Sequence, residues 1–189
     1  FKTRMSAETM WDYPLLHAAI EFGEKPSCIE EIFRESNPDD VTRVDALGRT
    51  PLLVAIEVAG NAPGDDSYWR EEMNSSEVIK MLLNDQQGGS SHAAQIPKEN
   101  LDEGITLPLH YALSLGVGVD DGLGHIVDAF PGALEIVDPE TKLLPFLSAA
   151  VGAQARVNTI YALTMARPNL ISNLCTSAIS TDVASTMEE

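Results

Sequence analysis

Paired carboxylates are the residues of this chain that could act in acid–base or metal chemistry. Asp65-Asp66 and Glu71-Glu72 lie close together in a segment that begins with Asn-Ala-Pro-Gly. A catalytic carboxylate needs surroundings that shift its pKa and a neighbouring base. The sequence of this segment indicates neither a pocket nor a base. Asp120-Asp121-Gly122 lacks the alternating oxygen ligands and the distal glutamate of a calcium loop. We therefore interpret the two pairs as a solvated loop and the third group as helix caps.

The histidines and cysteines are too scattered to predict a zinc site, since they stand at His17, His92, His110, His125, Cys28 and Cys175. Both cysteines have apolar neighbours, so we expect two free, buried thiols, with a disulfide between Cys28 and Cys175 as the alternative. His110 lies among apolar residues, which favours a framework role for its ring. The chain has no Ser-His-Asp order and no glycine-rich phosphate loop with lysine. We expect no catalytic activity, no cofactor and no metal.

The best candidate for a binding function is Tyr68-Trp69-Arg70, in the same acidic segment. These three residue types are enriched among the residues that dominate protein–protein binding energies. In the competing interpretation, Trp69 packs back onto neighbouring helices. The sequence leaves both interpretations open.

The charge of the chain narrows the classes of partner. Its 189 residues include 29 acidic and 12 basic side chains, for a net charge of -17. This charge repels phosphate backbones and anionic membrane surfaces, so we expect no nucleic acid and no membrane, and it permits a protein partner with a basic surface. The first residues lack the apolar core of a signal peptide, and no apolar run approaches the roughly 18 residues of a membrane span. We expect an intracellular, cytoplasmic protein, and we interpret the chain, which opens on Phe1, as a fragment.

A repeated pattern predicts the elements that must position these residues. Proline is followed four residues later by alanine at Pro14, Pro51, Pro108 and Pro145. The first two prolines are 37 residues apart, and so are the last two. Proline suits the first turn of a helix and glycine its end, so each copy predicts a helix. Further prolines at 38, 131 and 168 mark the end of a second helix in three copies.

We therefore predict an all-α fold, a helix-turn-helix repeat solenoid of about four repeats. Two insertions, at 61–72 and 84–102, lengthen the second repeat. A lead-in at 1–12 caps the first repeat, and 172–189 forms a partial capping helix and a frayed tail. The repeat domain spans 13–171, with repeats near 13–45, 46–101, 102–138 and 139–171.

The units resemble ankyrin repeats, whose mark is T-P-L-H-x-A in a period of about 33 residues. Pro108-Leu109-His110-Tyr111-Ala112 matches all of this except the threonine. Gly48-Arg49-Thr50-Pro51-Leu52 matches the turn and the threonine, but Leu53 replaces the histidine. The first and fourth copies have neither residue at the aligned positions. We therefore expect the hydrogen-bonded pairing of threonine with histidine to be absent.

The resemblance implies a non-catalytic protein–protein interaction or scaffold module, which we expect to be monomeric. In ankyrin arrays the partner meets the turns and the first helices, here represented by Glu21, Arg49, Glu57, Glu103 and Lys142. Substitution of Arg49 or Glu57 is then expected to weaken partner binding without lowering thermal stability. The alternative is a regulatory or substrate-docking domain of a larger enzyme whose catalytic part lies outside this chain.

Overall fold

The fold is a row of four helix pairs. A computed structural model describes residues 14–61, 74–85, 89–96, 98–100, 104–151 and 155–170. Most of these residues are helical, which confirms the predicted all-α class. The pairs are α1 (Leu15–Glu21) with α2 (Pro26–Glu35), α3 (Pro51–Asn61) with α5 (Ser75–Leu83), α6 (Pro108–Ser114) with α7 (Leu123–Ala129), and α8 (Pro145–Val151) with α9 (Val157–Ala166).

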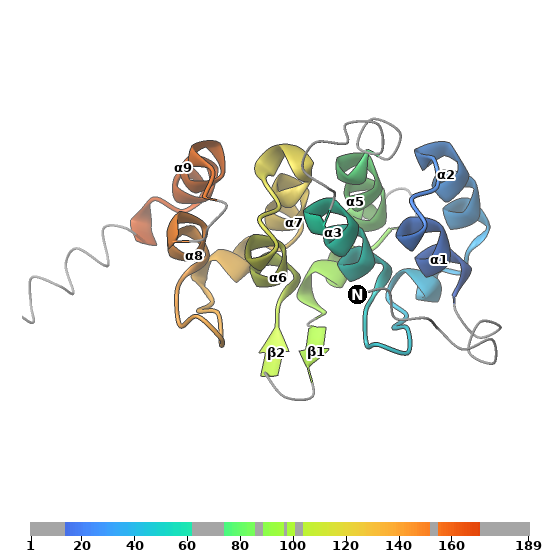
Figure 1. The fold of residues 1–189 in the computed structure, drawn as a ribbon, viewed down its shortest axis with the longest axis horizontal. Helices are drawn as coiled ribbons and strands as arrows, with labels where there is room; N and C mark the ends of the chain where they lie inside the picture. The colour runs from blue at the N-terminus through green and yellow to red at the C-terminus, as the bar shows by residue number, and fades with distance from the viewer. Residues whose placement is uncertain are drawn as a thin grey trace, which may run out of the picture.

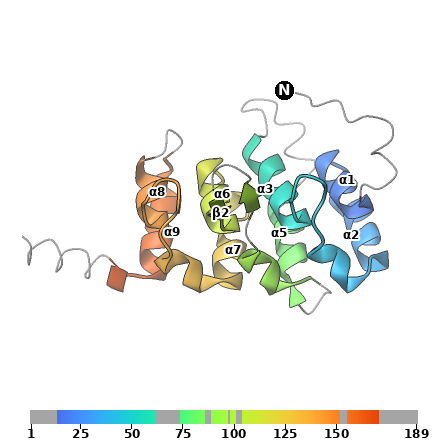
Figure 2. The same ribbon diagram turned by 90° about the horizontal axis from the view of Figure 1, so that it is seen from below.

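The helices form two layers along the long axis of the molecule (Figures 1 and 2). The first helices contact one another in the order α1, α3, α6 and α8, and the second helices in the order α2, α5 and α7. Each first helix also packs on the second helix of its own pair. The apolar core lies between the layers and runs from Leu16 in α1 to Leu163 in α9.

Short elements connect the helices. They are the 3-10 helices η1 (Pro38–Val41), η3 (Ser91–Gln95), η4 (Val119–Asp121) and η5 (Pro131–Glu135), and the strands β1 (Lys98–Asn100) and β2 (Gly104–Thr106). The strands pair antiparallel, with Glu99 opposite Ile105. None of the helices in the described ranges is both long and apolar enough to cross a lipid bilayer.

The second predicted insertion, 84–102, contains more structure than its linker-like composition indicated. Both η3 and β1 lie inside it. The carboxylate of Asp85 accepts the backbone N–H of Ser91 at 2.7 Å and its hydroxyl at 2.9 Å. Ala93 and Ala94 are buried in the core. This local clamp and the burial of two small side chains order the start of η3.

The first helix of every pair begins with the same backbone hydrogen bond. The bonds run from Ala18 N to Pro14 O, Val54 N to Thr50 O, Tyr111 N to Leu107 O and Ser148 N to Leu144 O, at 3.0–3.1 Å. In the last three pairs the residue after the acceptor is a proline, whereas in the first pair the acceptor is itself the proline. The motif of the first pair is therefore shifted by one residue against the others.

The glycines that follow the first helices give the same register. Gly23 after α1 has a φ of 70° and Gly116 after α6 a φ of 72°, in the left-handed region that glycine favours. Counted back from these glycines, the equivalent of Ala112 is Ala19, which is buried. The predicted spacing selected Ala18 instead, and that assignment is wrong for the first copy.

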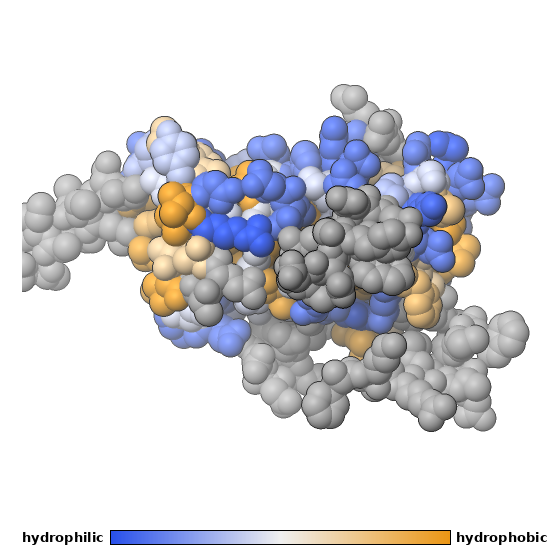
Figure 3. Space-filling view, turned by 45° about the horizontal axis from the view of Figure 1, so that its top comes forward, coloured by the Kyte–Doolittle hydropathy of each residue, from blue (hydrophilic) through white to orange (hydrophobic). Residues whose placement is uncertain are grey.

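The shift changes which side of α1 is buried, because one residue turns an α-helix by about 100°. The helical spacing of the apolar residues Leu15, Leu16, Ala18, Ala19 and Phe22 predicts one buried stripe, but Leu15 and Phe22 are 68% and 79% exposed. His17 and Ile20 are fully buried in their place. Figure 3 shows hydrophobic surface at both ends of the row, around α1–α2 and over α8–α9, with hydrophilic surface between them.

The exposure of Cys28 corrects the expectation of a buried thiol. Ser27 followed three residues later by Glu30 predicts a capping box at the start of the second helix. The box does not form, because α2 begins at Pro26 and Ser27 already lies inside the helix. The buried residues of α2 are Ile29 and Phe33. Cys28 precedes the first of these by one position and so lies outside the buried stripe.

Asn74 followed three residues later by Glu77 predicts a helix start at Asn74. This prediction is confirmed, since Asn74 Oδ1 accepts the backbone N–H of Glu77 at 3.4 Å where α5 begins. Several predictions fall outside the described residues. They concern the lead-in at 1–12, the segment with Tyr68-Trp69-Arg70, the tail at 172–189 and Cys175.

Candidate functional site

The turn before α3 is built around the carboxylate of Asp45. Asp45 Oδ1 accepts the backbone N–H groups of Leu47 at 2.8 Å and Arg49 at 2.9 Å. The N–H of Asp45 donates to the carbonyl of Arg49 at 2.9 Å. Gly48 supplies the left-handed φ of 71° that closes the turn. These bonds hold Arg49 at a fixed place two residues before Pro51.

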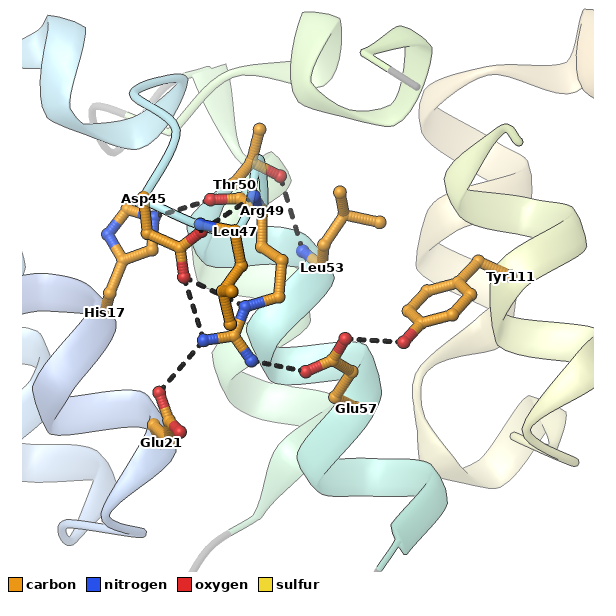
Figure 4. A network of polar contacts seen from close by, with 9 residues as sticks. All are labelled: His17, Glu21, Asp45, Leu47, Arg49, Thr50, Leu53, Glu57 and Tyr111. Carbon is orange, nitrogen blue, oxygen red and sulfur yellow. Dashed lines mark hydrogen bonds and ion pairs between the residues drawn. The ribbon is translucent and has the colours of Figure 1, made fainter. Parts of the chain in front are cut away.

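The guanidinium of Arg49 binds three carboxylates (Figure 4). Its Nε donates to Asp45 Oδ2 at 2.9 Å, its Nη1 to Glu57 Oε2 at 2.6 Å and its Nη2 to Glu21 Oε2 at 3.1 Å. The side chains of Arg49 and Asp45 are 9% and 0% exposed, that of Glu57 17% and that of Glu21 42%. The contacts join the turn to α1 and α3.

Two further bonds belong to this network, and one of them reaches a third helix pair. The hydroxyl of Tyr111 in α6 donates to Glu57 Oε1 at 2.5 Å. The Nε2 of His17 in α1 donates to the carbonyl of Arg49 at 2.9 Å, because a carbonyl can only accept. The network of His17, Glu21, Asp45, Arg49, Glu57 and Tyr111 therefore spans three pairs, and we call it the Arg49 network (Figure 4).

The pKa shifts keep these groups in fixed protonation states. Burial alone would raise the pKa of Asp45, but hydrogen bonds from Arg49 outweigh burial and lower it. Burial alone would lower the pKa of Arg49, and its bonds to Glu57 and Asp45 raise it instead. Burial and the bond to Glu57 both raise the pKa of Tyr111, while burial lowers that of His17. At neutral pH the arginine and aspartate are charged, the tyrosine is protonated and the histidine is neutral.

The turn before α8 has a similar backbone but different side chains. The carboxylate of Asp138 accepts the hydroxyl of Thr141 at 2.7 Å. The N–H of Asp138 donates to the carbonyl of Leu143 at 2.9 Å. Lys142, three residues before Pro145, has a φ of 60°. The lysine thus occupies the left-handed position that a glycine takes in the turn before α3.

His110 in α6 and His17 in α1 have equivalent positions. The Nε2 of His110 donates to the carbonyl of Ile136 at 3.0 Å. Both rings are buried, and burial lowers the pKa of both. The predicted framework role of His110 agrees with this bond. The sequence alignment placed Leu16 at the histidine position of the first copy, whereas the structure places His17 there.

Asp120 and Asp121 connect the third pair to the fourth. Asp121 Oδ2 accepts the N–H of Gly118 at 3.1 Å and binds Arg156 Nη1 at 2.5 Å. Asp120 accepts Asn158 Nδ2 at 2.8 Å. The carboxylate of Asp121 thus caps the turn of η4, whereas α7, which begins directly after Gly122, has no side-chain cap, so the predicted helix cap does not form there.

The structure brings together three of the predicted contact residues, namely Glu21, Arg49 and Glu57. The carboxylates of Glu21 and Glu57 both bind the guanidinium of Arg49, which is buried. From this geometry we now predict that replacement of Arg49 lowers stability, since its removal would leave three carboxylates without their cation. Lys142 is exposed in a separate turn. The remaining candidates, Tyr68, Trp69, Arg70 and Glu103, lie outside the described residues.

Sequence reasoning missed three members of the network. The spacing from Asp45 to Gly48 and Arg49 is a signal that could have found the aspartate, because Asp and Gly are the residues that such turns require. A one-residue slip of the first copy would have found His17. Tyr111 carries no sequence signal, since it meets Glu57 across 54 residues.

A metal site and a pocket are the other kinds of site considered in the described residues. Within the described ranges, no group of three or more His, Cys, Asp or Glu side chains is placed to hold a metal ion. A hollow of about 470 Å³ opens between α2 and α5. Its apolar lining includes Phe33, Val78 and Met81, and charged residues at its edge include Glu30, which is paired with Arg34 at 2.8 Å.

Comparisons with known proteins give no relative from which a function can be transferred. No protein-family model matches the chain, and neither curated proteins nor solved structures gave a significant match. The function is therefore inferred from the sequence and from the geometry of the molecule.

Proposed function

We propose that this chain is a divergent ankyrin-like repeat array and acts as a non-catalytic protein–protein interaction or scaffold module. The observation that carries the proposal is the recurrence of one helix-start hydrogen bond in four successive pairs, with first helices packed on first helices. A repeated unit that contacts only its neighbours produces an extended surface rather than a single deep pocket. Such a surface is suited to binding another protein.

The contact surface is best sought at the turns. The turn before α3, the β1–β2 ribbon and the turn before α8 all project from the same side of the molecule (Figure 1). In these turns Leu47 is 68% exposed and Lys142 is exposed, whereas Arg49 is buried. We therefore assign the contact role to the tips of the turns and a stabilising role to the Arg49 network.

The charge of the chain favours a partner with a basic surface. A net charge of -17 attracts such a partner and accelerates its association, and salt screens this attraction. The association rate is then expected to fall as the ionic strength rises. A rate that does not depend on salt would exclude this electrostatic part of the proposal.

Affinity capture with the full chain tests the proposal. Proteins captured from an extract of the source organism are identified, purified and titrated against the chain, so that a dissociation constant is measured with two isolated components. The Leu47→Ala variant shortens an apolar side chain at a turn tip without changing the charge, and the Val157→Ala variant makes a similar change at an exposed residue of α9, in the other layer. We expect several-fold weaker binding for Leu47→Ala and unchanged binding for Val157→Ala.

The double variant Tyr68→Ala/Trp69→Ala tests the remaining aromatic candidates in the same titration. Weaker binding at an unchanged melting temperature would assign these residues to the contact surface. Equal affinity of all these variants for every captured partner would contradict a binding surface at the turns.

A further inference from the structure

Each first helix has one side that faces the next pair. In α1, His17 and Glu21 contact Arg49, so this side of α1 faces the turn before α3. Glu57 is the equivalent of Glu21 in α3, and it contacts Tyr111 of α6. The same side of the first helix thus builds two successive junctions.

The opposite side of each first helix faces the preceding pair. Tyr111 and Val54 occupy equivalent positions, the first in contact with α3 and the second 1% exposed. The corresponding position of α1 is Ala18, and the next position on the same side is Phe22. Phe22 is 79% exposed and Leu15, one turn before Ala18, is 68% exposed. The first pair thus presents an apolar side that the described residues leave in contact with solvent.

The last pair presents an apolar side as well. In α8 the positions of His17 and Glu21 are taken by Leu147 and Val151. Val151 is 74% exposed, and Val157 at the start of α9 is 82% exposed. Hydrophobic surface is visible over α8–α9 and around α1–α2 (Figure 3). Apolar groups thus replace polar ones where the last pair would meet another.

The two ends also differ in their charged residues. Residues 15–35 contain five glutamates against Lys25 and Arg34. Residues 141–170 contain Lys142, Arg156 and Arg167 and no aspartate or glutamate, but Arg156 is paired with Asp121 and Arg167 with Glu135. The α8–α9 end is therefore close to neutral, and the two ends match each other through their apolar residues.

We propose that the chain associates head to tail with a second copy of itself, the α8–α9 end of one copy packing on the α1–α2 end of the next. The contact continues the relation that each pair has to its successor within the chain. It is heterologous, so one contact leaves two further ends open and successive copies form a linear assembly. This assembly replaces the monomer expected from the sequence.

The test uses the full 189-residue chain and two variants that each block one end. Phe22→Glu places a charge on the α1 side and leaves the α8–α9 end intact. Val151→Glu places a charge on the α8 side and leaves the α1–α2 end intact. Masses are measured by light scattering coupled to size-exclusion chromatography over a broad range of concentration and at low and high salt. Val44→Glu, at an apolar residue that is 51% exposed and lies at neither end of the row, is the matched control.

We expect the average mass of the wild-type chain and of Val44→Glu to rise with concentration, more steeply at high salt, because salt screens the repulsion between copies of net charge -17. Each blocked variant alone is expected to stay monomeric, whereas an equimolar mixture of the two forms a dimer that does not grow further. The mixture also shows that both variants fold, because each contributes one intact end.

Two outcomes would overturn the proposal. If the wild-type chain is monomeric at all concentrations, the apolar ends are covered by other residues of the same chain. If Phe22→Glu still dimerises alone while its mixture with Val151→Glu contains no heterodimer, the copies associate through two identical ends.

Discussion

The turn before α3 and the turn before α8 have similar backbones but are held by different side chains. Both begin with an aspartate whose carboxylate accepts hydrogen bonds from the turn. In the first turn Arg49 ties Asp45 to two more carboxylates. In the second, Thr141 bonds Asp138, and Leu143 stands where the arginine stands in the first. The aspartate therefore suffices for the turn, and the arginine has another role.

The residues around the second turn show the role of the arginine. The equivalents of Glu21 and Glu57 there are Ser114 and Val151, so the cation and both of its outer carboxylates are absent together. A buried charge is costly when its partner is lost, whereas a whole charged group can be replaced by uncharged residues at little cost. The two junctions thus show the charged and the uncharged version of one contact.

The largest expected effect tests this interpretation of the Arg49 network. Arg49→Leu leaves Asp45 and Glu57 near one another without a cation, and we expect a loss of about 3–5 kcal/mol in the free energy of unfolding, as for broken buried ion pairs. Urea titration followed by circular dichroism measures it. The triple variant that adds Glu21→Ser and Glu57→Val copies the second junction and is expected to recover much of the loss. A single variant as stable as the wild type would contradict the assignment.

A smaller effect is expected from the equivalent histidines. His110→Leu introduces the residue found at the equivalent positions 53 and 147, but it leaves the carbonyl of Ile136 without its donor. Loss of a partner to a buried polar group costs about 1–3 kcal/mol. The same urea titration measures the loss. If His110→Leu is as stable as the wild type, water has replaced the imidazole as the donor to the carbonyl of Ile136.

The pH dependence of stability also tests the role of the two buried histidines. The pKa values of His17 and His110 are lowered from 6.5 by burial, so the unfolded chain binds their protons more readily. Their contribution is fully present above pH 6.5 and is lost as the pH falls through the folded-state values. Melting temperatures should therefore decrease below pH 6.5, and less steeply in His110→Leu. Equal slopes for the two proteins would exclude a contribution from His110.

The smallest effect is expected at the two turn residues whose backbone is in the left-handed conformation. Lys142 has a φ of 60° and Gly48 a φ of 71°. A residue with a side chain is strained there by about 1 kcal/mol, so Lys142→Gly should raise the melting temperature slightly and Gly48→Ala should lower it. Differential scanning calorimetry of the two variants measures both shifts. If both variants shift in the same direction, backbone strain does not control these turns.

Much of the fold could be predicted because its signals are local. Pro51, Pro108 and Pro145 mark helix starts through their fixed φ, and the predicted cap at Asn74 forms. The first copy was placed one residue out of register because Pro14 precedes its helix rather than entering it. Because of this one-residue error, His17 was not recognised as a buried residue and Phe22 was not recognised as an exposed one.

The candidate site depended on contacts that the sequence does not encode locally. Arg49 was predicted from the turn pattern as an exposed contact residue. It is instead buried, because Glu21, 28 residues earlier, and Glu57, eight residues later, converge on its guanidinium. Tyr111 joins the network from 54 residues beyond Glu57.

The sequence by itself determined most of the helix starts and the number of helix pairs, because proline, glycine and capping residues act within a few positions of themselves. Only the tertiary structure decided which polar groups are buried and which apolar groups remain exposed at the ends of the row. Those outcomes depend on the side of each helix that meets its neighbour, and a shift of one residue in register changes that side.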